Sequence, residues 1–314
     1  MTTVLLVRHG LTASTGQLLT GWTPGVGLDD RGRAQATALG ERLAPVPLDA
    51  IVCSPLDRCR QTVDGIVAAR VLPSANAAQS ENTAQSGNAA QSGNAAQSGN
   101  AAQSGNAAPA GVAVPAGPAA HPALVPAPVI DDAVGECKYG DWTGKPLKEL
   151  EKDPLWPVVQ AHPSAVRFPG EAGESMLDMQ HRAVAAIRAW NVRLGKDAMY
   201  LVCSHGDVIK AIVADALGLH LDQCQRIVAD PCSLTVIRYT PLRPFLLRLN
   251  DTGGGVDDLL PRPAPPGEEG KTALSGESDA VIGGGAGSAA ASVASDARTS
   301  NPVGVAGTAP GTEG

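Results

Sequence analysis

Val4-Leu5-Leu6-Val7-Arg8-His9-Gly10-Leu11-Thr12 stands near the start of the chain, an apolar run that stops at two basic residues. Four apolar residues, two of them β-branched, are too few for a helix and indicate a short buried β-strand. The basic pair follows at the place where open α/β sheets form their ligand-binding crevices. This stretch therefore predicts an α/β fold with a polar site at the end of the first strand.

The same arrangement occurs again later in the chain. Met199-Tyr200-Leu201-Val202-Cys203 is an apolar run that leads into Ser204-His205-Gly206-Asp207, and residues 207–217 have helical spacing. A third run, Ala50 to Cys53, precedes Ser54-Pro55-Leu56-Asp57-Arg58-Cys59-Arg60-Gln61-Thr62. Pro55 suits the first turn of a helix that would carry the arginines and the threonine of this segment. The chain thus places polar motifs after three predicted strands.

These motifs resemble those of the histidine phosphatase superfamily, also called the phosphoglycerate-mutase-like family. The matching elements are the Arg-His-Gly-x-Thr opening, the Ser-Pro-x-x-Arg-x-x-x-Thr segment, the late Ser-His-Gly, and the glutamate Glu136 within residues 135–144. They occur in the right order over roughly residues 1–250. The resemblance implies a three-layer α/β fold, with an open, mainly parallel sheet and helices on both faces. It also implies phosphatase or phosphomutase activity that needs no cofactor.

The residues themselves suit phosphoryl transfer. Imidazole is a competent nucleophile toward phosphorus, so His9 is the candidate that would carry the phosphoryl group. The transferred group spreads its charge over equatorial oxygens, which calls for fixed donors from Arg8, Arg58 and, if protonated, His205. The resemblance assigns these four residues the same roles and makes Glu136 the general acid. From the residues alone, three other carboxylates stay open for that role: Asp132, Glu149 and Asp207.

The predicted substrate-binding residues overlap with the catalytic ones. They are Arg8, Thr15, Arg58, His205 and Gly206. Thr15 stands where relatives often carry an Asn that contacts the phosphoryl group, so a hydroxyl would have to replace that amide. Gly206 flanks the second histidine at a strand–helix junction and would offer a backbone donor to an anion. Four further cations are candidates for a second anionic group: Lys138, Lys145, Lys148 and Arg167.

Two segments of the chain cannot build a core. Residues 73–128 contain a six-residue repeat, Asn-Ala-Ala-Gln-Ser-Gly or a near copy, and then a Pro/Ala-rich stretch. A hexapeptide β-helix would need a recurrent large aliphatic residue, which this repeat lacks, so a disordered insertion is the better interpretation. Residues 251–314 are rich in Gly, Ala, Ser and Pro and indicate a disordered acidic tail. We therefore predict one histidine phosphatase domain over residues 1–250, interrupted by the insertion.

Charge and composition limit the classes of partner. The net charge is -7, and from Asp251 onward nine acidic residues stand against three basic ones, so the remaining chain is nearly neutral. This charge argues against nucleic acid or a membrane surface as the partner, and the resemblance implies a small-molecule phosphate ester. The chain lacks a signal-like or membrane-spanning apolar stretch, which favours a cytoplasmic location. Its six cysteines form no C-x-x-C pair, which favours buried free thiols in a reducing compartment. The absence of H-x-H and H-E-x-x-H spacing argues against a metal site.

Periodicity predicts the remaining elements. A helix begins near Asp29 or Asp30 and ends before Pro45 and Pro47, and its expected apolar face is Ala34, Ala38, Leu39 and Leu43. A second helix follows Ser175, with a core face made of Met176, Met179, Ala183, Ile187 and Trp190. Residues 233–239 and 245–249 are expected as two strands at the edge of the sheet. Trp22 and Trp142 are expected to serve packing.

Three functions remain compatible with these motifs. The favoured one is a phosphomonoester hydrolase that works through phosphorylated His9. A phosphomutase with the same site is the alternative, but it must exclude water, and the roughly 37 residues between Glu136 and Glu174 leave room for only a modest lid. A non-catalytic phospholigand-binding protein is the third. The sequence sets neither the identity of the ester nor the oligomeric state.

Overall fold

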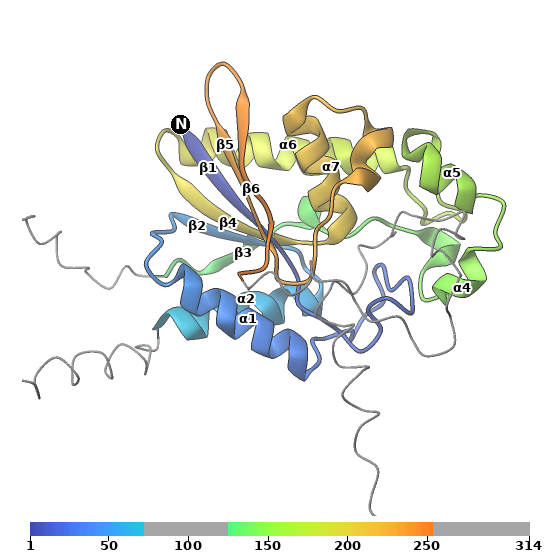
Figure 1. Ribbon diagram of the computed structural model, residues 1–314, viewed down its shortest axis with the longest axis horizontal. Coiled ribbons are helices and arrows are strands. Elements are labelled where there is room, and N and C mark those ends of the chain that lie inside the picture. The colour runs from blue at the N-terminus through green and yellow to red at the C-terminus, as the bar shows by residue number, and fades with distance from the viewer. Residues whose placement is uncertain (72–124, 254–314) are drawn as a thin grey trace, which may run out of the picture. The chain divides into compact units, whose positions relative to one another are not determined.

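The computed structural model describes residues 1–71 and 125–253, which form a six-stranded sheet covered by helices (Figure 1). The strand order is β3-β2-β4-β1-β5-β6. The strands are β1 (Thr2–Arg8), β2 (Ala50–Cys53), β3 (Pro128–Ile130), β4 (Met199–Ser204), β5 (Leu234–Tyr239) and β6 (Pro244–Asp251). β1, β2, β3 and β4 are mutually parallel, while β5 runs antiparallel to β1 and β6. The predicted mainly parallel sheet with two strands at one edge is confirmed.

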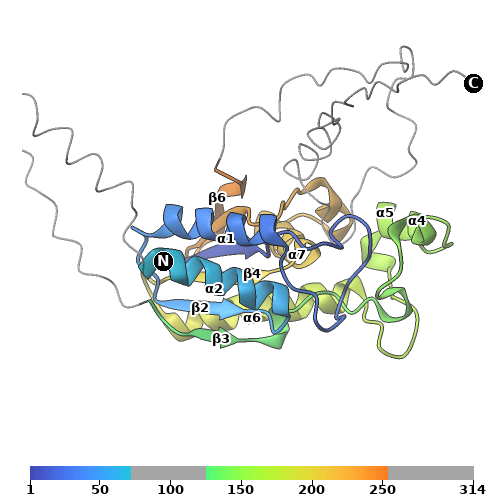
Figure 2. The same ribbon diagram turned by 90° about the horizontal axis from the view of Figure 1, so that it is seen from below.

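Helices cover both faces of the sheet (Figures 1 and 2). α1 (Asp30–Leu43) and α2 (Asp57–Val71) pack on one face, and α6 (Met176–Leu194) and α7 (Gly206–Leu217) pack on the other. Side chains alternate along a strand, so β1 sends Leu5 and Val7 into the core under α1 and α2 and sends Val4 and Leu6 into the opposite core. Both faces of the central strand are therefore buried, which explains its continuous apolar run.

Short helices lie beyond the carboxyl ends of the parallel strands (Figure 1). They are the α-helices α4 (Leu147–Leu150) and α5 (Trp156–Ala161) and the 3₁₀-helices η1 (Asp132–Val134), η2 (Gly140–Trp142), η3 (Pro163–Ala165) and η4 (Leu221–Arg226). Trp142 is buried among Trp156 and Phe168 in this region, as the sequence predicted for a packing residue. This layer closes the end of the sheet where the polar motifs emerge.

The helix ends follow the sequence signals. Asp29 caps α1, because its side chain accepts from the Gly32 amide at 2.8 Å. Ser175 caps α6 in the same way by accepting from the Asp178 amide at 3.0 Å. The predicted core face of α6 is confirmed: Met176, Met179, Ala183, Ile187 and Trp190 are all buried.

The predicted apolar face of α1 is partly wrong. Ala34 and Ala38 are exposed, and the buried positions besides Leu39 and Leu43 are Gly32, Ala36 and Gly40. The reason is a close approach of backbones: a Cβ at Gly32 would lie 2.1 Å from the carbonyl oxygen of Leu11. Small residues therefore form this face, and a pattern of apolar side chains does not reveal it.

Three boundaries differ from the sequence-based ones. β3 begins at Pro128 and β6 ends at Asp251, so these residues belong to the sheet and not to the predicted insertion and tail. Pro55 lies two positions before α2 and not in its first turn. The other predictions for residues 73–124 and 254–314 lie outside the described residues. No helix within the described ranges is long and apolar enough to span a bilayer. The six cysteines are all buried, with free thiols.

The contact between α1 and the loop after His9 gives a testable prediction for stability. Gly32→Ala forces a methyl group against the Leu11 backbone, so we expect the free energy of unfolding to fall by about 1–3 kcal/mol in urea denaturation. Ala34→Ser on the exposed side of the same helix is the matched control and should change it little. A more stable Gly32→Ala protein, as helix propensity alone would give, would contradict the close contact.

Candidate active site

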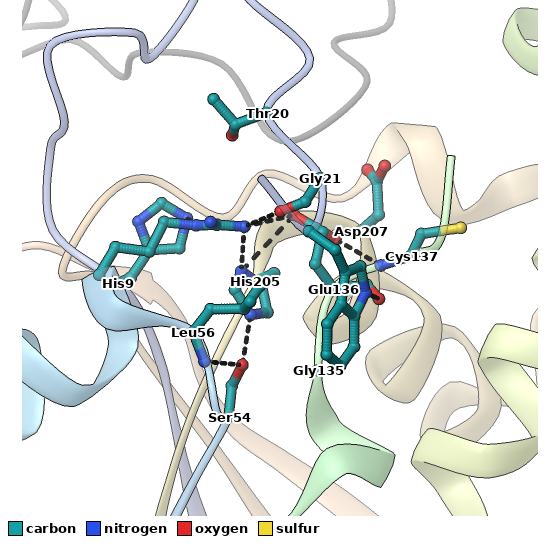
Figure 3. A network of polar contacts seen from close by, with 12 residues as sticks. His9, Thr20, Gly21, Ser54, Leu56, Gly135, Glu136, Cys137, His205 and Asp207 are labelled. Carbon is teal, nitrogen blue, oxygen red and sulfur yellow. Dashed lines mark hydrogen bonds and ion pairs between the residues drawn. The ribbon is translucent and has the colours of Figure 1, made fainter. Parts of the chain in front are cut away.

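The parallel strands bring the polar motifs together at one edge of the sheet. Arg8 ends β1 and pairs in register with Ser204, which ends β4, so His9 and His205 leave neighbouring strands at the same level. Their ring centroids are 5.2 Å apart. Figure 3 shows His9 and His205 at this site. Arg58 reaches both rings from the first turn of α2.

Arg58 links the parts of this site. Its Nε donates to His9 Nε2 at 3.2 Å, and its Nη2 lies 3.2 Å from His205 Nδ1. The same Nη2 donates to the carbonyl oxygen of Gly21 at 2.9 Å. The guanidinium is 1 % exposed, and its Nη1 has no hydrogen-bond partner within the described residues. The group is therefore buried with one donor nitrogen to spare.

The hydrogen bonds define which nitrogen of His9 is available. His9 Nδ1 lies 2.8 Å from the Gly10 carbonyl oxygen, which can only accept, so Nδ1 carries the proton. Nε2 then keeps its lone pair and faces Arg58. Burial, followed by the charges of Arg58 and Arg8, lowers the pKa of His9 well below its usual value. His9 is thus a neutral imidazole whose Nε2 lone pair accepts from Arg58 Nε.

His205 has the opposite tautomer. Arg58 donates to its Nδ1, so Nε2 carries the proton and faces the Ser54 hydroxyl at 2.7 Å and the Cys59 thiol at 3.4 Å. Burial and then the charges of Arg58 and the other site cations lower the pKa of His205 well below its usual value. From the sequence, His205 is expected as a donor only if protonated, and its lowered pKa favours the neutral ring.

Glu136 is the carboxyl group that faces the histidines. Its Oε2 lies 3.6 Å from His205 Nδ1 and 3.9 Å from Arg58 Nη2, and its Oε1 accepts from the Cys137 amide at 2.9 Å. Burial, and next the charge of Asp207, raise the pKa of Glu136 to about 7. Of the alternatives from the sequence, Asp132 and Glu149 are exposed, and Asp207 accepts a hydrogen bond from Tyr139.

A cavity lies over His9. Arg8 contributes to its wall and is anchored by donating to the Ala229 carbonyl oxygen at 2.8 Å. Burial lowers the pKa of Arg8 to about 10, so the guanidinium stays charged at neutral pH. The lining residues are Arg8, His9, Thr12, Thr15, Gly16, Leu18, Leu19, Thr20, Gly21, Glu136, Tyr139 and Leu147.

The two remaining predicted binding residues have different positions. Thr15 lines the cavity, and its hydroxyl lies 2.9 Å from the Thr12 hydroxyl and accepts from the Thr12 amide at 2.9 Å. Gly206, the first residue of α7, is buried and is not part of the cavity wall formed by the described residues. Of the four extra cations, Lys138 and Arg167 line a separate groove of about 760 Å³, whereas Lys145 and Lys148 are exposed.

Sequence reasoning missed the residues that hold the Glu136 segment. Arg182 of α6 donates to the carbonyl oxygens of Ala133, Gly135 and Glu136 at 2.8–2.9 Å. It also forms an ion pair with Glu174, whose Oε1 lies 2.6 Å away. Arg182 interrupts the apolar face of α6 three residues after Met179, which is the signal that the sequence offered. Trp22, expected as a packing residue, packs on Gly135 and also donates to the Glu136 carbonyl oxygen at 2.6 Å.

Metal ligands are not grouped here. Within residues 1–71 and 125–253, no cluster of three or more His, Cys, Asp or Glu side chains could hold a metal ion. The charged donors at the site are the guanidinium groups of Arg8 and Arg58, which suit an anion.

Family comparison agrees with this geometry. The model of the histidine phosphatase superfamily (branch 1) matches residues 4–78 and 117–252. The chain belongs to this superfamily. A probable phosphatase of Schizosaccharomyces pombe is 38% identical over 60 residues, which is 19% of this chain and 29% of that protein.

Solved structures share the fold of this chain. Bacillus stearothermophilus YhfR is 22% identical, with 80% of this chain and 98% of that chain covered and a TM-score of 0.56. A phosphoserine phosphatase of Entamoeba histolytica in complex with 3-phosphoglyceric acid is 17% identical, with coverage of 81% and 98% and a TM-score of 0.56. A mycobacterial glucosyl-3-phosphoglycerate phosphatase is 19% identical, with coverage of 79% and 98% and a TM-score of 0.54.

The raised pKa of Glu136 predicts a pH-dependent stability. Between the usual value of 4.5 and about 7 the folded state binds more protons than the unfolded chain, so stability falls as pH rises through this window. Glu136→Gln removes this loss of stability. We expect its free energy of unfolding to exceed that of the wild type by roughly 2–3 kcal/mol at pH 8 and to match it near pH 4.

Urea denaturation across that pH range measures the difference. Glu149→Gln, which changes an exposed carboxyl, is the matched control and should follow the wild type at every pH. An E136Q protein that is no more stable than the wild type at high pH would contradict the raised pKa of the buried Glu136.

Proposed function

We propose that this histidine phosphatase is a phosphomonoester hydrolase in which His9 carries the phosphoryl group between two steps. The supporting observation is Arg58, a buried guanidinium that contacts the lone-pair nitrogen of His9 and keeps Nη1 unpaired within the described residues. An unpaired buried donor costs about 1–3 kcal/mol, and a phosphoryl oxygen would satisfy it. A neutral imidazole beside an unpaired guanidinium nitrogen favours a phosphoryl group as the ligand.

In the first step the His9 Nε2 lone pair attacks phosphorus, and the bond from phosphorus to the ester oxygen breaks. The departing alkoxide needs a proton, which Glu136 supplies as the neutral acid that its pKa of about 7 permits. The products are phosphohistidine and a free alcohol. In the second step water attacks the phosphorus, Glu136 takes its proton, and phosphate leaves with the lone pair of His9 restored.

The guanidinium groups would stabilise the charge on the equatorial oxygens. Arg8 and Arg58 offer planar donors fixed by their contacts with backbone carbonyl oxygens, so little reorganisation is needed during transfer. A dianionic phosphoryl group beside His205 would favour its protonated form, because an opposite charge nearby raises the pKa of a histidine. His205 would then become the third donor. Thr15, on the cavity wall, would contact the substrate through its hydroxyl.

Loss of the nucleophile provides the direct test. We expect His9→Ala to lower kcat/KM for phosphomonoesters by about 10³-fold or more, assayed over a panel of esters without added metal. Rapid quenching of the wild type should trap an acid-labile phosphoryl adduct, and His9→Ala should trap none. His181→Ala, on the surface of α6, is the matched control and should keep wild-type turnover. Unaltered turnover in His9→Ala would contradict the proposal.

Product analysis separates hydrolysis from the mutase alternative. A hydrolase releases one free phosphate for each ester consumed, whereas a phosphomutase accumulates an isomeric ester. Phosphorylated sugars and glycerates are suitable substrates because each has a second hydroxyl group. Accumulation of an isomer without free phosphate would replace the hydrolase with the mutase, and the His9 adduct would be common to both.

The role of Glu136 as acid predicts a pH profile that depends on the leaving group. For an alkyl phosphate, kcat/KM should fall about tenfold for each pH unit above about 7, because the protonated fraction of Glu136 falls at that rate. For an ester with an acidic phenol as leaving group, the first step needs no proton and the decline should be much weaker. Profiles with the same decline for both substrates would contradict Glu136 as the acid.

A further inference from the structure

A second buried carboxyl group lies beside the site, and the proposed reaction does not use it. Asp207 occupies the first turn of α7, two residues after His205, and is 1 % exposed. Glu136 is 3 % exposed. In Figure 3, Asp207 lies on the side of Glu136 that faces away from His9. Ionising two neighbouring buried carboxyl groups together costs much free energy. The groups around them therefore decide which of the two keeps its proton.

A hydrogen-bond donor and an ammonium group lie beside the carboxyl group of Asp207. The Tyr139 hydroxyl donates to its Oδ2 at 2.8 Å, and the Lys210 ammonium lies 3.9 Å from its Oδ1. Lys210 is itself buried and donates to Gln225 Oε1 at 3.1 Å, which holds it in place. A hydrogen-bond donor and an ammonium group both stabilise a carboxylate. The positive end of the helix dipole, at the first turn of a helix, also stabilises a carboxylate.

Tyr139 connects this pair to the catalytic cavity. Tyr139 lines the cavity with His9 and Glu136, and its hydroxyl donates to Asp207. Burial, and next the charge of Asp207, raise the pKa of Tyr139 well above its usual range, so its hydroxyl remains a donor. Tyr139, a residue of the cavity wall, is thereby hydrogen-bonded to the carboxyl group of Asp207.

The contacts of Glu136 favour the neutral form by comparison. Its Oε1 accepts one backbone hydrogen bond, from Cys137, and its nearest cationic nitrogen is Arg58 Nη2 at 3.9 Å. The titratable and charged groups around it come from five parts of the chain. They are Arg8 and His9 at the end of β1, Arg58 of α2, Arg182 of α6, His205 and Asp207 at the β4–α7 junction, and Cys137 and Tyr139 of its own segment. Burial and Asp207 raise the pKa of Glu136, whereas Arg58 and Arg8 lower it, and the raising effects are the larger.

We propose that Asp207, anchored by Tyr139 and Lys210, is a positioning residue whose negative charge keeps the proton on Glu136 while the enzyme waits for substrate. This inference rests on the proposed function of Glu136 as general acid. Asp207 touches no reacting atom in this scheme. It decides which of two neighbouring carboxyl groups enters the reaction protonated.

The test replaces the charge and keeps the shape. Asp207→Asn retains an oxygen that can accept from Tyr139, and we expect the alkaline limb of kcat/KM for an alkyl phosphate to move down by about one pH unit. Activity at pH 8 should therefore fall about tenfold, while activity at pH 5.5 stays close to that of the wild type. Asp207→Glu should restore the wild-type profile. Asp215→Asn, a partly exposed position on the same helix, is the matched control and should leave the profile unchanged.

A purely structural role would give a different result. Equal loss of activity at every pH, or an unmoved alkaline limb, would overturn the proposal. If Asp207→Asn leaves Lys210 too poorly accommodated to fold, the double variant D207N/K210M removes both charges and should show the same displaced limb.

A second measurement needs no substrate and separates this inference from the proposed function. The stability difference between Glu136→Gln and its parent, followed against pH, should develop at lower pH in the Asp207→Asn background than in the wild type. A wild-type protein without phosphatase activity would overturn the proposed function only. Identical stability profiles in the two backgrounds would overturn the role of Asp207, whatever the enzyme hydrolyses.

Discussion

The site depends on one buried cation, the guanidinium of Arg58. It lies between two imidazoles and 3.9 Å from the Glu136 carboxyl group, where water contributes little to its solvation. Burying an ion costs several kcal/mol unless other groups replace its hydration, and here the Gly21 carbonyl oxygen and the two ring nitrogens do so. Burial lowers the pKa of both histidines, and burial with the charge of Asp207 raises the pKa of Glu136. Neutral imidazoles and a carboxyl group with a raised pKa therefore lie beside a fixed positive charge.

The sheet provides the rigidity that this arrangement requires. The first histidine follows a strand buried on both faces, and the Gly10–Gly32 contact presses its loop against α1 at backbone distance. The Gly10 amide donates to the Thr62 hydroxyl at 3.0 Å, which ties the same loop to α2. Parallel strands end together, so side chains far apart in sequence arrive at one level without long flexible connections. Precise placement of this kind lets preorganised donors act on a developing charge.

Glu136 is held by contacts with its backbone more than with its side chain. Arg182 and Trp22 bind the carbonyl oxygens of the Glu136 segment from different parts of the chain. Next to it, the Tyr139 hydroxyl donates to Asp207, and Asp207 raises the pKa of Glu136. The position and the pKa of Glu136 thus depend on different groups. Such a division is common where two carboxyl groups share a site and perform different tasks.

The sequence by itself determined the central strands, the polar motifs that follow them and the family. Each of these motifs is a local signal, an apolar run that stops at Arg-His or Ser-His. It also placed the core face of α6, where large side chains repeat at helical spacing. It failed for α1, since glycines that allow backbone contact at Gly32 and Gly40 carry no hydrophobic pattern. Only the tertiary structure shows that Glu136 Oε2 lies 3.6 Å from His205 Nδ1 and that Arg182 donates to the Glu136 carbonyl oxygen. Burial and charge at a residue depend on what the fold packs around it, and spacing along the chain does not contain that information.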